Sequence, residues 1–226
     1  MESTSEIVSL IANRENLYRL LSRFYRIEID EAFLCQLEGM TFPEDCNDAD
    51  LAEGYKMLTE WLLSPNEDPL TNLAVDYARV FLGAGIFEGP VAYPYESVYT
   101  SKERLIMQEA RDQVLAIYRA KGLERIATFE VPEDHVSIEL EFMSHLCREA
   151  REALLAGDPA RAVVSFKEQR EFLDNHPLKW IPAFCADIEA CATSDFYLAV
   201  AKMTRGFLNM EQSIIEELVE ETMAAL

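Results

Sequence analysis

Apolar residues recur every three or four positions along almost the whole of this chain, which is the spacing of helices that bury one face. The stripes cover 7–24, 51–62, 70–81, 107–118, 138–154, 162–173, 181–188 and 196–218. Arg14 is the one polar interruption of the first stripe. The chain has only 8 glycines and 9 prolines in 226 residues, too few for the many tight turns of an all-β fold. One short run with strand character, 127–131, is too isolated to form a sheet. The sequence therefore predicts an all-α protein, a single globular, bundle-like domain over residues 1–226.

Two stretches between the predicted helices are longer than a turn requires. The first, 83–100, combines glycines and prolines with aromatic residues, namely Phe87, Tyr93, Tyr95 and Tyr99. Long loops in a compact domain are usually functional or disordered, and disordered segments are poor in aromatic residues. We therefore expect a functional loop at 83–100 and a hinge-like segment at 122–134. The segment 176–182 is predicted to be a corner between helices, packed by Trp180.

The charge and cysteine content limit the compartment and the partners. A total of 41 acidic against 20 basic residues gives a net charge of −21, which repels nucleic acid and anionic membranes and attracts a basic partner. The same acidity is also compatible with a role in solubility alone. The five cysteines are scattered, without a CxxC pair, as is typical of a reducing compartment. The start of the chain is polar, and no run approaches the roughly 18 apolar residues of a membrane span. We expect a cytoplasmic protein that neither binds nucleic acid nor inserts stably into a membrane.

Acid–histidine pairs on one predicted helix raise the possibility of a metal site. His135 and Glu139 lie one turn apart, as do Glu141 and His145. A carboxylate-bridged di-iron site would need Glu-x-x-His units, and neither that spacing nor HExxH is present. The pairs are therefore predicted to lie on a solvated helix face. No nucleophile elbow or phosphate-binding glycine motif is present either, so we expect no enzyme activity, no metal and no cofactor.

The segment Pro132–His135 has the composition of a helix start. Proline suits the first turn, and the carboxylates of Glu133 and Asp134 suit the positive end of the helix dipole. Capping does not explain His135, because the positive form of histidine is disfavoured there. Two interpretations stay open, a helix cap and a binding site. The aromatic loop has the same two interpretations, an anchor for the loop or the lining of a peptide groove.

Three blocks of this sequence resemble the TorD/DmsD family of cytoplasmic molybdoenzyme chaperones, also called redox enzyme maturation proteins. The blocks occur in the same order as in that family and at similar spacing. They are Tyr77–Gly83 continuing to Pro94–Tyr99, then Pro132–His135 with Glu139–Met143, and finally Phe172–His176 with Trp180–Pro182.

The resemblance implies an all-helical chaperone that binds the twin-arginine signal peptide, and the apo form, of the catalytic subunit of a molybdopterin-containing oxidoreductase. Such a chaperone assists cofactor insertion, delays export through the Tat pathway until maturation, and is a monomer or a homodimer. A carboxylate can bind a guanidinium bidentately, and aromatic rings can stack on it or cover the apolar part of the peptide. The peptide-binding residues that the resemblance implies are Asp134, His135, Tyr77, Phe81, Pro94, Tyr95, Tyr99, Pro132 and Glu133.

Two other functions remain compatible with the residues. One is a generic helical adaptor with no preference for signal peptides. The other is a metal-dependent helical enzyme that uses His135, Glu139 and His145.

Overall fold

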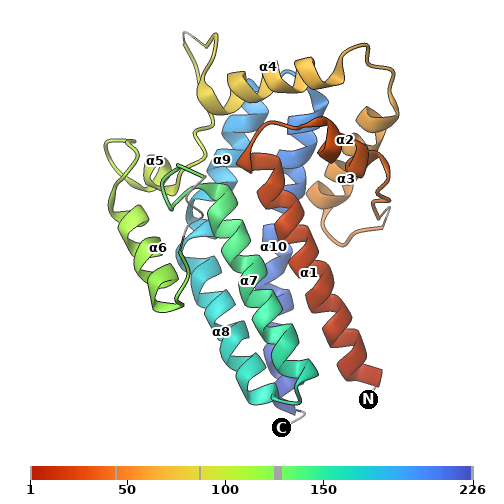
Figure 1. Ribbon diagram of the computed structural model, residues 1–226, viewed down its shortest axis with the longest axis vertical. Coiled ribbons are helices and arrows are strands. Elements are labelled where there is room, and N and C mark those ends of the chain that lie inside the picture. Colours follow the sequence, from red (N-terminus) through yellow and green to blue (C-terminus); the bar gives the residue numbers. More distant parts are fainter. Residues whose placement is uncertain (1, 44, 87, 125–128, 225–226) are drawn as a thin grey trace. The chain divides into compact units, whose positions relative to one another are not determined.

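The computed structural model describes residues 2–43, 45–86, 88–124 and 129–224, and these residues fold into helices joined by loops (Figure 1). Their helices are α1 (Glu2–Arg26), α2 (Glu31–Glu38), α3 (Ala49–Leu63), α4 (Pro69–Leu82), α5 (Glu96–Thr100), α6 (Glu109–Ala120), α7 (Val136–Leu155), α8 (Pro159–Asn175), α9 (Pro177–Cys191) and α10 (Asp195–Ala224). No strand forms within the described ranges, where the extended pairing is an isolated bridge between Tyr95 and His135. The prediction of an all-α fold is confirmed. Phe87 and the first two residues of the run 127–131 lie outside the described residues.

Every predicted stripe corresponds to a helix, although the stripe 107–118 was predicted to begin at Met107, which lies in the loop before α6. Two further helices were not predicted. α2 has only two turns, and Asp30 caps it by accepting a hydrogen bond from the Phe33 backbone N at 2.8 Å. α5 occupies the last five residues of the predicted loop 83–100, so the irregular part ends at Tyr95. The predicted corner at 176–182 is also shorter than expected. α8 ends at Asn175, and α9 begins at Pro177 and continues through Pro182.

The chain divides into two compact units, each built from segments that are distant in the sequence. Unit 1 contains residues 1–23, 95–180 and 211–226, and unit 2 contains residues 24–94 and 181–210. The helices α1, α9 and α10 each supply residues to both units. The single-domain organisation stays a prediction. Within the part of the chain that is described, no helix is both long and apolar enough to cross a membrane.

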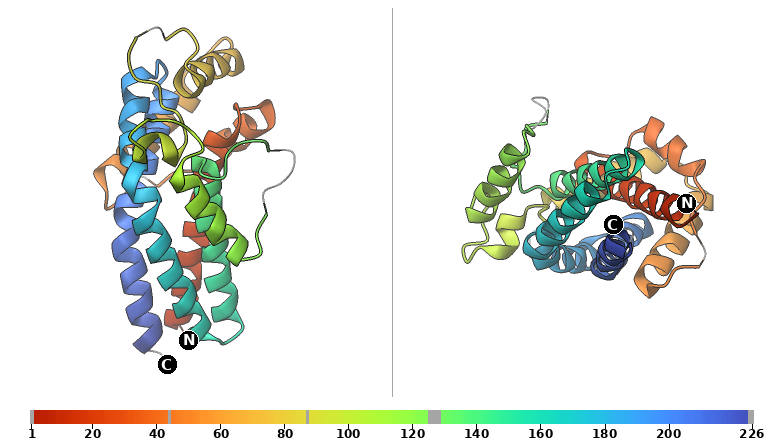
Figure 2. Two further views of the ribbon diagram at one scale, coloured as in Figure 1. Left: turned by 90° about the vertical axis from the view of Figure 1, so that its left-hand side faces the viewer. Right: turned by 90° about the horizontal axis from the view of Figure 1, so that it is seen from below.

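Within unit 1, the antiparallel helices α7 and α8 pack against each other and run side by side in both views of Figure 2. The turn between them uses Gly157 in the left-handed region, with φ of 74°. Asp158 then caps α8 by accepting from the Arg161 backbone N at 3.0 Å, and Pro159 occupies the first helical position. The buried hydroxyl of Ser165 donates to the Leu146 carbonyl at 2.8 Å and joins the two helices.

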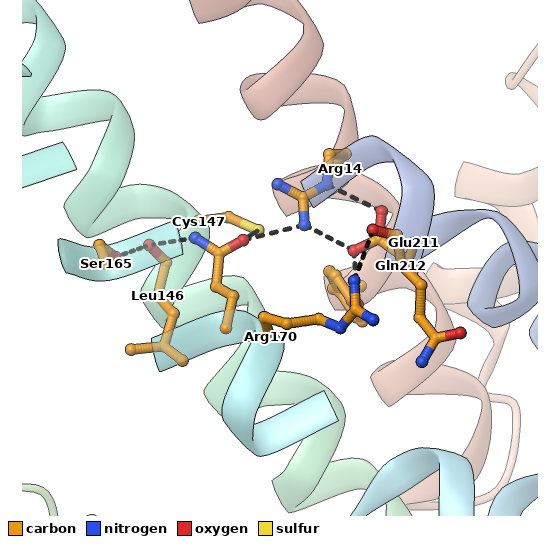
Figure 3. A network of polar contacts seen from close by, with 9 residues as sticks. Arg14, Leu146, Cys147, Ser165, Arg170, Glu211 and Gln212 are labelled. Carbon is orange, nitrogen blue, oxygen red and sulfur yellow. Dashed lines mark hydrogen bonds and ion pairs between the residues drawn. The ribbon is translucent and has the colours of Figure 1, made fainter. Parts of the chain in front are cut away.

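Arg14 of α1 forms a buried ion pair with Glu211 of α10 inside unit 1 (Figure 3). Its Nε and Nη2 atoms lie 2.8 and 2.6 Å from the two carboxylate oxygens of Glu211. Nη2 also donates to Oε1 of Gln169 in α8 at 2.9 Å, and the Tyr18 hydroxyl donates to Glu211 at 2.6 Å. The polar interruption of the first stripe is therefore a buried link among three helices of this unit.

Unit 2 has an aromatic core and a capped start of α10. The ring of Phe81 packs edge-on against Tyr25 and Tyr197, at centroid distances of 5.8 and 5.4 Å. The carboxylate of Asp76 accepts from the backbone N atoms of Thr193 and Ser194 at 2.9 and 3.0 Å, just before α10 begins. Asp76 therefore satisfies backbone groups that no helix could satisfy.

Candidate functional site

Residues from all three sequence blocks meet in the interior of unit 1. We call Glu96, Glu139, His176 and Trp180 the buried junction, because all four side chains are buried. Nδ1 of His176 lies 2.9 Å from Oε2 of Glu96. Trp180 donates from Nε1 to Oε2 of Glu139 at 2.9 Å. Blocks that are up to 80 residues apart in the sequence are thereby joined in one cluster.

The carboxyl groups of Glu96 and Glu139 interact electrostatically inside the buried junction. Burial, followed by the negative charge of Glu96, raises the pKa of Glu139 well above its usual range. The raised pKa favours the neutral, protonated form of the Glu139 carboxyl group. The prediction that Glu139 lies on a solvated face is wrong. The spacing from His135 does not show which face of the helix is buried, and Glu139 lies on the buried face of α7 together with Val136 and Met143.

Asp134 connects the start of α5 to the segment that enters α7. Its side chain is 0% exposed, and Oδ2 accepts from the Ser97 backbone N at 2.9 Å. Its carbonyl accepts from the Glu96 backbone N at 3.0 Å. Ser97 in turn accepts through Oγ from the Gln108 backbone N at 3.1 Å. Asp134 therefore holds the chain around α5 and is not the cap of α7.

His135 is the residue that caps α7. Its Nδ1 atom accepts from the Ser137 backbone N at 3.1 Å, as a neutral imidazole can and an imidazolium cannot. Burial lowers the pKa of His135 to about 3, so the ring is neutral at physiological pH. His135 is therefore itself the cap of α7, and its neutral ring avoids the positive charge that a helix N-terminus disfavours. The prediction of a solvated His135 is also wrong, because the ring is buried.

Partly exposed aromatic and charged side chains surround these buried residues. The Tyr95 ring packs edge-on against His135 at 5.1 Å. The Tyr99 ring lies 5.5 Å from Trp180, and the guanidinium of Arg104 lies 5.7 Å from the centre of the Tyr99 ring. Oε2 of Glu133 accepts from Nε of Arg111 at 2.6 Å. This region of unit 1 therefore presents ring faces and a carboxylate at its surface.

The structure brings six of the nine predicted site residues together in unit 1. Asp134 and His135 are buried, and four others are partly exposed, namely Tyr95, Tyr99, Pro132 and Glu133. The remaining three, Tyr77, Phe81 and Pro94, belong to unit 2 and are buried.

In unit 2, the Tyr77 hydroxyl donates to the Tyr25 carbonyl at 3.2 Å, and the Tyr77 and Phe81 rings lie 4.9 Å apart.

The buried junction itself was not predicted from the sequence. The position of Glu139 on the buried stripe of α7 could have revealed it.

Across the described residues, no group of three or more His, Cys, Asp or Glu side chains is arranged to hold a metal ion. Glu141 is exposed, and Nδ1 of His145 contacts Arg148 Nη2 at 2.8 Å. Both stand at the surface side of α7, as the sequence predicted for this pair.

The buried junction and His135 should give the melting temperature opposite pH dependences. The pKa of Glu139 is raised on folding, so the contribution of Glu139 to folding stability is fully present below pH 4.5 and is lost as the pH rises. The pKa of His135 is lowered, so its contribution is present above 6.5 and is lost as the pH falls toward about 3. Glu139→Gln should therefore flatten the decline in melting temperature above pH 4.5, because glutamine stays neutral and still accepts from Trp180.

The matched variant is His135→Asn, which retains a capping side chain. It should flatten the fall in melting temperature only where the pH drops below 6.5. Thermal unfolding followed by circular dichroism over a pH series measures both slopes. Parallel curves for Glu139→Gln and the wild type would show that Glu139 is ionised in the folded protein.

Comparison with known proteins places the chain in a family. Residues 44–186 match the family model described as the nitrate reductase delta subunit. Proteins named chaperone protein TorD are similar over nearly their full lengths. Those of an Ogawa and an El Tor Inaba strain of Vibrio cholerae serotype O1 are 29% and 30% identical, with 96% of this chain and 98% of each relative covered. The TorD protein of Shewanella pealeana is 25% identical, with 94% of both chains covered.

The family match covers more than half of the chain and includes all three sequence blocks. The relatives are named as chaperones, which confirms the expectation of a chaperone rather than an enzyme. The chain belongs to the TorD-type chaperones of the nitrate reductase delta subunit family.

Proposed function

We propose that this chaperone binds the twin-arginine signal peptide, and the apo form, of the catalytic subunit of a molybdopterin-containing oxidoreductase. By holding that subunit it assists cofactor insertion and delays Tat export until maturation is complete. Because insertion precedes export, the chaperone acts in the cytoplasm, as a monomer or a homodimer. The observation that carries the proposal is the convergence of the three family-like blocks on the buried junction, beside partly exposed aromatic side chains.

The chemistry of the surface around Tyr99 suits an arginine-containing peptide. The Tyr99 ring already faces one guanidinium, that of Arg104, at 5.7 Å. Glu133 already forms a 2.6 Å ion pair with the guanidinium of Arg111. Each group thus has the geometry to receive an arginine of a partner in exchange for its internal one. The net charge of −21 favours the encounter with a basic peptide.

The proposed site residues have different tasks. Tyr95, Tyr99, Pro132 and Glu133 are partly exposed and contact the peptide. Asp134 and His135 are buried and act as positioning residues, because they fix α5 and the Tyr95 ring. Tyr77, Phe81 and Pro94 belong to the proposed site on the resemblance alone.

The role of Asp134 can be tested with two variants. Asp134→Asn keeps a side-chain oxygen for the Ser97 backbone N, so its melting temperature and its affinity for the peptide should both stay close to those of the wild type. Asp134→Ala leaves that N–H without its acceptor, which costs about 1–3 kcal/mol of stability. Thermal unfolding and calorimetric titration with the peptide measure the two quantities. A tenfold loss of affinity in Asp134→Asn at an unchanged melting temperature would instead place the carboxylate in direct contact with an arginine.

A pull-down from the native host tests the proposed function as a whole. We expect the tagged chaperone to capture a molybdoenzyme catalytic subunit that still carries its signal peptide and lacks its cofactor. Deleting the signal peptide from the chromosomal copy of that subunit should reduce the capture. Unrelated proteins captured in equal amounts with and without that deletion would favour a generic helical adaptor.

A further inference from the structure

The loop 101–108, between α5 and α6 in unit 1, exposes three consecutive large apolar side chains. Leu105, Ile106 and Met107 are 57%, 48% and 53% exposed, and we call them the apolar ridge. Among the described residues, the other exposed large apolar side chains occur at single positions along the chain. Single exposed apolar residues are ordinary, whereas a contiguous group indicates an interaction surface.

The loop is held in a conformation that costs energy. Arg104 and Met107 have φ angles of 52° and 62°, and they are the described non-glycine residues with positive φ. Side chains other than glycine, asparagine and aspartate seldom adopt this region because Cβ approaches the backbone. Such outliers persist only when the surrounding structure enforces them, and they concentrate at binding sites. Folding alone favours relaxed backbone angles and buried apolar side chains. This loop combines strained backbone angles with exposed apolar side chains.

The contacts that enforce this conformation also connect the ridge to the proposed site. The Gln108 backbone N donates to Oγ of Ser97 at 3.1 Å, and Gln108 Nε2 donates to the Ile106 carbonyl at 3.0 Å. On the other side of the ridge, Arg104 lies over the Tyr99 ring. Ser97 is also the residue that Asp134 holds. The apolar ridge is therefore continuous with the surface that contains Tyr99, and Figure 1 shows this loop projecting outward beside α5 and α6.

A twin-arginine signal peptide offers two arginines followed by an apolar segment. We propose that the apolar ridge binds that apolar segment, while an arginine of the same peptide takes the place of Arg104 on the Tyr99 ring. This inference rests on the proposed function and assigns residues to the apolar half of the ligand. The arginines and the apolar segment are adjacent in the peptide, and the Tyr99 ring that binds a guanidinium is adjacent to the apolar ridge in the protein. The net negative charge of the chain also attracts the basic end of the peptide.

The test combines a ridge variant with two peptides. The variant is Leu105→Ser with Ile106→Ser and Met107→Asn, since asparagine tolerates positive φ and exposed positions contribute little to stability. One peptide carries two arginines and a leucine-rich apolar segment, and the other carries the same arginines with that segment replaced by serine and glycine. The wild type should bind the first peptide at least about tenfold more tightly than the second, because the second peptide buries less apolar surface on the ridge.

In calorimetric titrations, the ridge variant should bind both peptides equally and should still prefer the two arginines over two alanines. The matched control is Leu155→Ser with Val164→Ser, which removes exposed apolar side chains elsewhere in unit 1 and should behave as the wild type does. A ridge variant that still binds the apolar peptide tenfold more tightly would overturn the inference and leave the proposed function standing. A wild type that binds neither peptide would overturn both.

Discussion

Replacing Arg14 by methionine should lower the free energy of unfolding by about 3–5 kcal/mol, because it leaves Glu211 buried without its cation. The carboxylate of Glu211 would lose both guanidinium contacts and would keep the hydrogen bond from the Tyr18 hydroxyl. Arg14→Met retains the apolar length of the side chain, so most of the loss comes from the unpaired charge and little from a cavity. Urea unfolding followed by circular dichroism measures the change.

The control variants separate the buried charge from other effects. Arg14→Met combined with Glu211→Met removes both charges and should recover most of the lost stability, since apolar residues often replace a buried ion pair without loss. Lys56→Met breaks the exposed pair with Glu60 and should change stability by less than about 1 kcal/mol. If Arg14→Met alone is as stable as the wild type, Glu211 is not an ionised partner of Arg14 in solution.

The helices could be predicted from the sequence because their pattern is local. A one-sided apolar stripe depends only on residues within a few turns, and every stripe corresponds to a helix. α5 was missed for the same reason, because its five residues cannot form a stripe. It is held instead by Asp134, which lies 37 residues away from its partner Ser97.

The polar interior could not be predicted, since its meaning depends on distant partners. In the sequence Arg14 is only a polar interruption of an apolar stripe. Its partner in the ion pair, Glu211, lies 197 residues further along the chain. The sequence around Glu139 favours a solvated helix face, because its neighbours Glu96 and Trp180 come from distant parts of the chain. The resemblance to a family indicated which blocks matter, but it did not show that they share a buried cluster. The role of His135 could not be predicted for a different reason. Only a neutral imidazole can accept the capping hydrogen bond, and the burial that keeps the ring neutral depends on the fold.

Replacing both arginines of a cognate signal peptide by alanine should weaken binding about 100-fold or more. Hydrogen bonds to charged groups contribute roughly 1.5–3 kcal/mol each, and each 1.4 kcal/mol is a factor of ten in affinity. Lysine in place of both arginines should give an intermediate affinity, because lysine keeps the charge and lacks the planar fork. Added salt should weaken the arginine peptide most, since exposed charges are screened beyond roughly 8–10 Å.

The most direct measurement is therefore a calorimetric titration of the purified full chain with the two-arginine and two-alanine forms of one signal peptide, in the same buffer. Recognition of the two arginines predicts a Kd at least about 100-fold lower for the arginine peptide, with a difference that shrinks as salt is added. Equal Kd values for the two peptides would contradict signal-peptide recognition and leave a helical adaptor that does not read the two arginines.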